Sequence, residues 1–465
     1  KKICLLLGPA LFLLAFIPYA GLDLKIRLAL GTVLWMGVWW VTLPVPAAIT
    51  AFLPVAINAI FSLTDMQSVI SCYSAELVFL LAGSDIISMA WEATGVDQRI
   101  AARSLALVGT SVKQQILVWF IIATLLSSVL PNTVVAAVMC SIAMSMLKAV
   151  GEGDVKNSKS ASLILLAIVY GANNGGMLTP LGGAMNLVTV SYIEGFTGTE
   201  FLYSDWVVRM LPFTLLATAV TALFLVGGDC GKKHFDCSRE HFRELCRSFP
   251  KLDRAGKASM VIFFAAAILA FTRGLYQQLL PALKPGYIFL IGGLLMFFLK
   301  DEHGEAVVTW EKAEKNLMWG LFFLFSGGTA LGALVNGSGA ADTLAEIISG
   351  INFHSEFTLI IAIVTLNVIL SDVVNNTACA AVTIPIVISI AQGLGLPVIP
   401  YLWIATVSYN LSFTLPTSIR SIPVGYGLDT RFMFRKGVVV TGCMILLVSV
   451  MGWLFVRYWP AFTAL

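Results

Sequence analysis

The sequence predicts an all-α protein that crosses a membrane many times, in two related halves. Of its 465 residues, 58% are hydrophobic and only 12% are charged, whereas roughly 25% of an ordinary soluble protein is charged. Long stretches carry no charged residue: Ile3–Leu22, Leu28–Thr64, Gln114–Leu147, Ala161–Ile193, Met210–Gly228, Asn316–Ala341, Val373–Ile419 and Gly437–Val456. A membrane-spanning helix needs about 20 such residues, so we expect about eleven transmembrane helices and two shorter re-entrant helical hairpins.

The first apolar stretch follows Lys1 and Lys2 and therefore resembles a signal peptide. It lacks a small-residue cleavage site before the next apolar stretch, which favours a retained first helix.

An internal repeat relates the two halves. The heptads Ser127–Thr133 (SSVLPNT) and Ser371–Thr377 (SDVVNNT) are identical at four of seven positions and lie 244 residues apart. The same offset relates Gly83 to Gly327. Such a repeat is typical of transporters that bind their substrate between two structural repeats. We divide the chain into a first half (residues 1–227), a linker (228–257) and a second half (258–465).

The linker indicates the orientation of the chain in the membrane. It contains eight Lys or Arg residues, and the positive-inside rule places it, together with the N-terminus, on the cytoplasmic side. The stretch Thr64–Ser74 before the first repeat is nearly uncharged, which is typical of the outer side. This asymmetry favours an inverted repeat.

A cluster of cysteine and histidine residues also lies in the linker. Its members are Cys230, His234, Cys237, His241 and Cys246. Their spacing matches no established zinc pattern, which favours reduced thiols over a metal site.

The Asn-Thr pair of each heptad follows an apolar run that is too short to cross the membrane comfortably, Ile116–Leu130 or Leu359–Val374. Another apolar run follows at once. We therefore predict re-entrant hairpins near residues 114–133 and 356–377, with their tips near the bilayer midplane. Broken backbone at that depth must be buried in protein or line a watery cavity.

The tips have the chemistry of an anion site. A helix starts near Thr133 and another near Thr377, and the unpaired amides at helix starts bind anions. Asn132 and Asn376 add amide donors without adding charge. We expect the two tips to hold the two carboxylates of one small molecule. The alternative is that these residues serve helix packing or capping, and the occurrence of the pair twice in register weighs against it.

Glycine and proline clusters near residues 175–186 and 412–423 predict interrupted helices, whose free carbonyls can bind cations. Arg420 lies in the second cluster. Either it is buried and pairs with an anion or a set of carbonyls, or it extends to the cytoplasmic surface. Asp85 is a candidate partner for Arg420, or a group that handles a proton.

At these motifs the chain resembles the divalent anion–sodium symporter family, which carries di- and tricarboxylates or sulfate. The resemblance covers most of the chain and includes Trp39-Trp40, Leu53-Pro54, Trp319-Gly320 and Ile384-Pro385. It implies a homodimer with a fixed scaffold and a moving, elevator-type domain in each subunit.

The family carries Ser-Asn-Thr at each hairpin tip, and the resemblance implies roles for individual residues here. The resemblance implies that Asn132, Thr133, Asn376 and Thr377 bind the substrate, and we add Gly183, Ser418 and Arg420 as candidate substrate-binding residues. The cation positions are Ser127, Gly182 and Ser371, and the candidates that substitute for a cation where the chain departs from the family are Pro131, Asn375 and Arg420.

Two departures from the family pattern affect the sodium sites. Pro131 and Asn375 stand where the family has serine, and proline offers no hydroxyl. Arg420 lies beside the second cation position, where a guanidinium at roughly 5 Å would repel sodium by about 3 kcal/mol at an effective dielectric of about 20. We therefore expect sodium-independent exchange of succinate, malate, fumarate or 2-oxoglutarate, with Arg420 in place of at least one coupling ion.

The sequence leaves several alternatives open. A sodium-coupled dicarboxylate symporter agrees with the retained Ser127 and Ser371, and Na⁺ is then required; otherwise no cofactor is expected. Proton coupling through Asp85, and sulfate as substrate, are further alternatives.

Other classes of protein are disfavoured. The four histidines fall in charged or loop-like stretches, so neither a catalytic dyad nor a metal site of an enzyme is predicted. Neither half contains the repeated ring of a channel pore. We expect no nucleic-acid partner, and we place the protein in the cytoplasmic membrane.

Overall fold

The computed structural model describes residues 2–18, 22–96, 99, 111–235, 252–340, 343, 355–373 and 376–463. Within these residues the regular elements are all helices, accompanied by two isolated β-bridges. Six described helices are long and apolar enough to cross a membrane, and six shorter apolar helices of 10–17 residues accompany them. The prediction of an all-α polytopic membrane protein is confirmed.

The elements of the first half are α1 (Lys2–Leu13), η1 (Leu14–Phe16), α2 (Leu24–Thr42), α3 (Ala47–Thr50), α4 (Leu53–Phe61), α5 (Met66–Ile70), η2 (Ser71–Ser74), α6 (Glu76–Thr94), α8 (Val112–Ser127), α9 (Asn132–Ala149), α10 (Lys159–Gly176), η3 (Pro180–Gly182), α11 (Ala184–Thr197) and α12 (Tyr203–Val226). Those of the second half are α14 (Arg254–Phe271), α15 (Arg273–Tyr276), α16 (Pro285–Met296), α17 (Trp310–Asn316), α18 (Trp319–Gly337), α20 (Glu356–Val373), α21 (Asn376–Gly393), α22 (Val398–Asn410), η4 (Ser418–Arg420), α23 (Ser421–Gly425), α24 (Thr430–Tyr458) and α25 (Pro460–Thr463).

The repeat read from the sequence is also a repeat of helices. An offset of 244 residues carries α9 onto α21 at both ends, and it carries α6 and α8 onto α18 and α20 to within two residues. Both heptads therefore occupy the same structural position, the connection between a helix that ends and a helix that begins.

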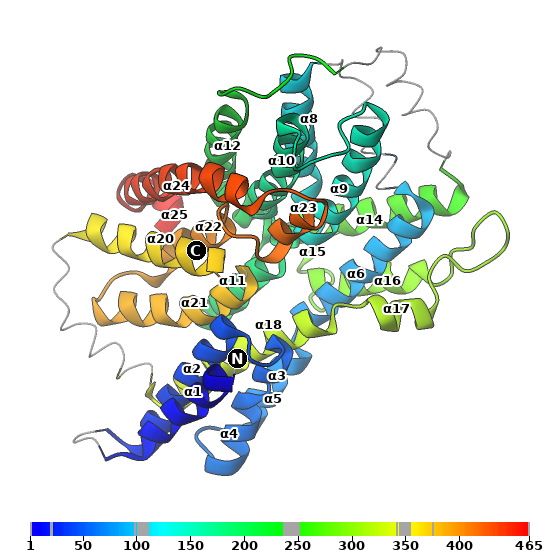
Figure 1. Cartoon of the computed structure of the whole chain (residues 1–465). Coiled ribbons are helices and arrows are strands. Elements are labelled where there is room, and N and C mark those ends of the chain that lie inside the picture. The colour runs from blue at the N-terminus through cyan, green and yellow to red at the C-terminus, as the bar shows by residue number, and fades with distance from the viewer. Residues whose placement is uncertain are drawn as a thin grey trace.

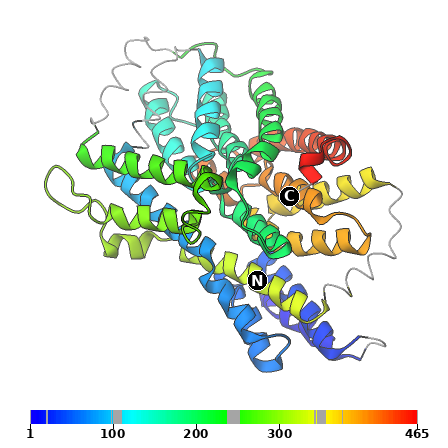
Figure 2. The ribbon, with the colours of Figure 1, turned by 180° about the vertical axis from the view of Figure 1, so that it is seen from behind.

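The helices pack into two groups, and each half contributes to both. The first group consists of α1–α6 and α14–α18, and the second of α8–α12 and α20–α25. Figures 1 and 2 show α1–α5 at one end of the molecule, α8, α10 and α12 at the opposite end, and α11 and α18 between them. The two groups meet where α11 and α21 pack against α18.

Polar contacts also join the two groups. The Arg273 guanidinium, 2% exposed, donates to both carboxylate oxygens of Glu200 at 2.7 and 3.0 Å. The Tyr192 hydroxyl on α11 donates to the Gly328 carbonyl on α18 at 3.2 Å.

Helix α10 lies at the centre of the second group and is buried from Ser160 to Gly176. It packs closely on α8 because it presents glycine to that helix. A β-carbon at Gly175 would lie 2.0 Å from the Thr124 carbonyl oxygen, and one at Gly171 would lie 2.4 Å from that of Phe120. Backbone can approach backbone at these positions only without a side chain.

Candidate functional site

A cavity of about 590 Å³ lies between the two groups. The second group contributes residues next to both hairpin tips and both interrupted helices. The first group contributes the end of α2, the middle of α6 and the start of α18. The cavity is thus bordered by the heptads of both halves and closed by helices of the other group.

The first tip forms because Pro131 cannot continue α8. Pro131 adopts φ −53° and ψ 129°, and α9 begins directly after it at Asn132. Pro131, Asn132 and Thr133 all line the cavity. The first amides of α9 are unpaired within the helix, so this wall presents donors rather than charge.

The second tip repeats this arrangement. Helix α21 begins at Asn376, and Asn376, Thr377 and Val373 line the cavity. The side-chain oxygen of Asn376 accepts hydrogen bonds from the hydroxyls of Ser371 at 2.9 Å and Ser412 at 3.2 Å. These bonds fix the orientation of the amide, so its NH₂ group is the part available to a ligand. Asn375 lies outside the described residues.

The interrupted helices supply the remaining wall of the second group. Helix α10 ends at Gly176 and α11 begins at Ala184, with Gly183 extended between η3 and α11. Helix α22 ends at Asn410, and Ser418 adopts the left-handed region at φ +51°. Gly183 and Ser418 both line the cavity.

Equivalent hydrogen bonds attach both tips to the segments that follow them. Thr179 donates through its hydroxyl to the carbonyl of Ser128, and Thr417 donates to the carbonyl of Asp372 at 2.7 Å. Ser128 and Asp372 occupy the same heptad position. Each half thus holds its own tip with a threonine from its own interrupted segment.

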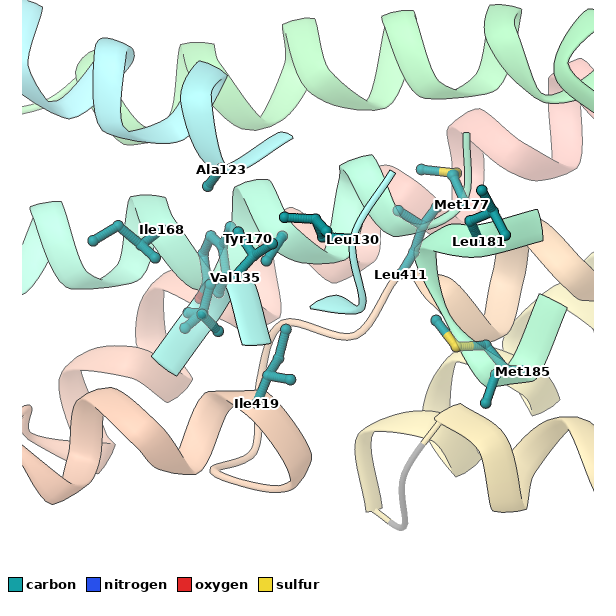
Figure 3. Packing of buried hydrophobic residues seen from close by; sticks show 14 of the residues in the cluster. Ala123, Leu130, Val135, Ile168, Tyr170, Met177, Leu181, Met185, Leu411 and Ile419 are labelled. Carbon is teal, nitrogen blue, oxygen red and sulfur yellow. The ribbon is translucent and has the colours of Figure 1, made fainter. Parts of the chain in front are cut away.

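Apolar side chains hold the two interrupted segments together behind the cavity. Figure 3 shows Leu130 beside the first tip, Tyr170 on α10, and Leu411 and Ile419 from the second half packed in one cluster. The Tyr170 hydroxyl donates to the Phe413 carbonyl at 2.8 Å. This contact joins α10 of the first half to the interrupted segment of the second half.

The helices that begin at or next to residues that line the cavity include α9, α11, α18 and α21. A helix start carries roughly half a positive charge and free N–H donors. The cavity is therefore suited to an anion, although its described lining contains neither Lys nor Arg.

Asp85 on α6 is the one charged residue among the described residues that line the cavity. Its side chain is 4% exposed and accepts a hydrogen bond from the backbone N–H of Met318 at 3.2 Å. It does not pair with Arg420, so that expectation from the sequence was wrong.

Arg420 is fully buried behind the cavity wall and is not part of the lining. Backbone carbonyls and hydroxyls surround its guanidinium. Nε donates to the Leu415 carbonyl at 2.6 Å, one terminal nitrogen donates to the carbonyl and hydroxyl of Ser412, and the other donates to the Thr417 hydroxyl at 2.7 Å. The alternative of an arginine that extends to the cytoplasmic surface was therefore wrong.

The buried guanidinium is paired with Asp372, the second residue of the second heptad. One carboxylate oxygen of Asp372 lies 3.4 Å from a terminal nitrogen of Arg420. The backbone carbonyl of Asp372 accepts a hydrogen bond from the same nitrogen at 3.4 Å. The carboxylate also accepts from the backbone N–H of Thr414 at 3.0 Å and from its hydroxyl. This partner was not identified from the sequence. A carboxylate inside a hairpin tip could have indicated it, because a buried carboxylate and a buried guanidinium each require an opposite charge.

The predicted cation positions lie behind the tips. Ser127 donates to the Ala172 carbonyl at 2.8 Å, and Ser371 donates to the Tyr409 carbonyl at 2.6 Å, an equivalent bond in each half. Gly182 packs closely on Gly176 and does not line the cavity.

In the first half, a neutral side chain donates hydrogen bonds to the backbone carbonyls of the segment between α10 and α11. The Asn186 amide donates to the carbonyls of Gly176 and Thr179 at 2.6 and 2.9 Å. In the second half the guanidinium of Arg420 has this role. The oxygens present in the second half are of the kind that holds Na⁺, but a cation of the protein itself already engages them.

The cysteine and histidine cluster of the linker, for which the sequence favours reduced thiols over a metal site, can be judged only in part. Cys237, His241 and Cys246 lie outside the described residues. Cys230 is buried, and the part of the chain that the structure describes contains no group of three or more His, Cys, Asp or Glu residues placed to hold a metal.

The fold and the site together define a polytopic membrane transporter. A family model described as citrate transporter matches residues 37–408, and this chain belongs to that family. The resemblance to divalent anion–sodium symporters is thereby confirmed, and the chain is a transporter rather than an enzyme.

Named relatives agree with this assignment. The sodium-dependent dicarboxylate transporter SdcS of Staphylococcus aureus (strain USA300) is 26% identical over 434 residues, which cover 90% of this chain and 83% of the relative. SdcS of Staphylococcus saprophyticus is 25% identical over 441 residues, covering 91% and 84%.

A solved structure shows the same fold. The crystal structure of the Alcanivorax borkumensis YdaH transporter, whose topology is described as unusual, matches with a TM-score of 0.58 at 14% identity. The match covers 92% of this chain and 99% of that one.

Proposed function

We propose that this protein transports C4 and C5 dicarboxylates, such as succinate, malate, fumarate and 2-oxoglutarate, by exchange that does not require sodium. The two carboxylates of the substrate bind at the two tips, one at Asn132 and Thr133 and the other at Asn376 and Thr377. These four residues line one cavity, and each pair stands at the first turn of a helix.

Neutral donors suit a carrier, because the substrate must leave as readily as it enters. Hydrogen bonds to an ionised carboxylate contribute roughly 1.5–3 kcal/mol each, which gives binding without a buried ion pair. Gly183 and Ser418 contribute backbone beside the two ends of the substrate.

The observation that carries the exchange proposal is the cage around Arg420. Three backbone carbonyls and two hydroxyls, all oxygens of the kind that coordinates Na⁺, point to a guanidinium that cannot leave the protein. A guanidinium that stays in this position in both directions of transport occupies the oxygens that a coupling ion, carried along with the substrate, would otherwise use. Coupling to a sodium gradient is then lost, and exchange of one anion for another remains.

Sodium-coupled symport is the second candidate. The names of the SdcS relatives favour it, and so do Ser127 and Ser371, which keep their hydroxyls in equivalent positions.

Movement of the second helix group against the first completes the proposal. We place the protein in the cytoplasmic membrane as a homodimer, with the N-terminus and the linker in the cytoplasm. The first group then acts as the scaffold, and the second carries both tips across the membrane.

Transport by proteoliposomes distinguishes the two candidates. Vesicles that contain the purified chain are loaded with unlabelled succinate, and the entry of labelled succinate is measured with and without sodium. We expect rapid entry that requires internal succinate and is unchanged when potassium replaces sodium. Entry that requires sodium and no internal anion contradicts exchange and supports symport.

A further inference from the structure

The cavity contains a carboxylate where a doubly negative substrate is proposed to bind. Asp85 lines the same cavity as the two tips and is the one charged residue in its described lining. Its side chain is 4% exposed, so little water screens it. An ionised Asp85 and a bound dianion would repel each other more strongly in this cavity than in bulk water.

No described cation compensates Asp85. Arg420 lies behind the wall and is paired with Asp372. Of the helices that pack on α6, α16 and α18 carry no charged residue. Glu311 and Lys315 on α17 pair with each other, and none of the ion pairs found among the described residues includes Asp85.

The remaining charged side chains on α6 and on the helices packed against it are Glu76 and Glu92 on α6, Arg254 and Lys257 on α14, Glu194 on α11, and Lys312 and Glu314 on α17. Glu76, at the start of α6, faces Lys284 and the N–H of Gly286. Glu194 accepts from the N–H of Phe201. None of these residues lines the cavity.

The repeat does not require a charge at this position. The offset of 244 residues places Thr329 where Asp85 stands in the first half. The described contact of Asp85 is the Met318 N–H at the start of α18, and a neutral side-chain oxygen can also accept that hydrogen bond. The negative charge is therefore not explained by this contact.

We infer that a dicarboxylate binds in this cavity together with one proton, which is taken up from water by the carboxylate of Asp85. This inference rests on the proposed function. The protonated side chain still accepts the Met318 N–H through its carbonyl oxygen. Its new O–H group faces the cavity as a donor to the substrate, so protonation removes a repulsion and adds a hydrogen bond. Asp85 is therefore a substrate-binding residue, and it belongs to the first helix group.

Calorimetry on the full chain in detergent tests this directly. Fumarate is the probe, because carboxyls titrate near pH 4 and it is doubly ionised from about pH 6 to about pH 8. Heats of binding are compared at one pH in buffers of different ionisation enthalpy, with sodium absent. We expect uptake of about one proton per fumarate, and an affinity that falls by up to about tenfold per pH unit as the pH rises.

Asp85→Asn is the informative variant, because asparagine keeps an oxygen for the Met318 N–H and cannot take up the proton. We expect no proton uptake and an affinity that is independent of pH. Glu92→Gln removes an exposed carboxylate from the same helix and is expected to retain the proton uptake of the unchanged chain.

Each other outcome decides against the inference. Binding without proton uptake by the unchanged chain overturns it without any variant, as does equal uptake by Asp85→Asn. A third contrary result is fumarate binding that occurs only when sodium is added and takes up no proton, because a metal cation then neutralises Asp85. Failure of the unchanged chain to bind fumarate overturns the proposed function as well.

Discussion

Asn132 and Asn376 show how a neutral residue can define an anion site. Each begins a helix, and each is nearly buried, at 9% and 5% exposure. A charged residue at either position would require a buried partner, whereas a neutral amide requires no counter-charge.

Removal of either amide is expected to weaken substrate binding. Asn132→Ala or Asn376→Ala should raise the KM for succinate about tenfold or more, because a hydrogen bond to a carboxylate contributes roughly 1.5–3 kcal/mol. The measurement is the initial rate of succinate exchange over a range of concentrations. Asn316→Ala, on the exposed surface of α17, is the control; a KM within twofold of the unchanged chain for both tip variants contradicts the assignment.

The pair Arg420–Asp372 is expected to act as one unit. Arg420→Gln leaves a buried carboxylate without its cation and should destabilise the protein by about 3–5 kcal/mol. The double variant Asp372→Asn with Arg420→Gln should recover most of this loss, since neither charge remains. Thermal unfolding in detergent measures both effects. Additive losses in the double variant would show that the two side chains do not interact.

At the scale of elements, close helix packing depends on single glycines. Gly175→Ala is expected to lower the Tm markedly, because its β-carbon would lie 2.0 Å from the Thr124 carbonyl and force α8 away from α10; overpacking of this kind costs typically 1–3 kcal/mol. Gly442→Ala in α24, where a β-carbon meets no atom within 4 Å, serves as the control. Equal melting temperatures for the two variants would contradict the described packing of α8 on α10.

The elements at the site could largely be predicted from the sequence. Pro131, the glycines near residue 182 and the Asn-Thr pairs interrupt apolar runs, and each interruption has a local cause in backbone chemistry. The positions where α9 and α21 begin follow from these residues alone.

Contacts between distant segments could not be predicted in this way. The partner of Arg420 is a residue 48 positions earlier, and the choice of Asp372 over Asp85 depends on how α20 and the interrupted helix pack. The repeat also gave no indication that α6 and α18 would close the cavity, because they belong to the other helix group. Periodicity identifies elements, but not which of them face a common space.

At the scale of the whole molecule, the two helix groups are proposed to move against each other. A β-carbon at Gly328 on α18 would lie 2.7 Å from that of Ala381 on α21, so a small shift permits a disulfide between cysteines at these positions. Oxidation of the variant Gly328→Cys with Ala381→Cys should stop succinate exchange, and reduction should restore it. Gly328→Cys alone, treated with the same oxidant, is the control. Exchange that continues after complete cross-linking would show that the groups need not separate.

A density map of the protein with bound succinate, determined by electron cryomicroscopy, tests the central claim most directly. The account predicts an elongated density in the cavity, with one end at the first turn of α9 by Asn132 and Thr133 and the other at the first turn of α21 by Asn376 and Thr377. Density at a site away from both tips, or contact with one tip alone, would contradict it.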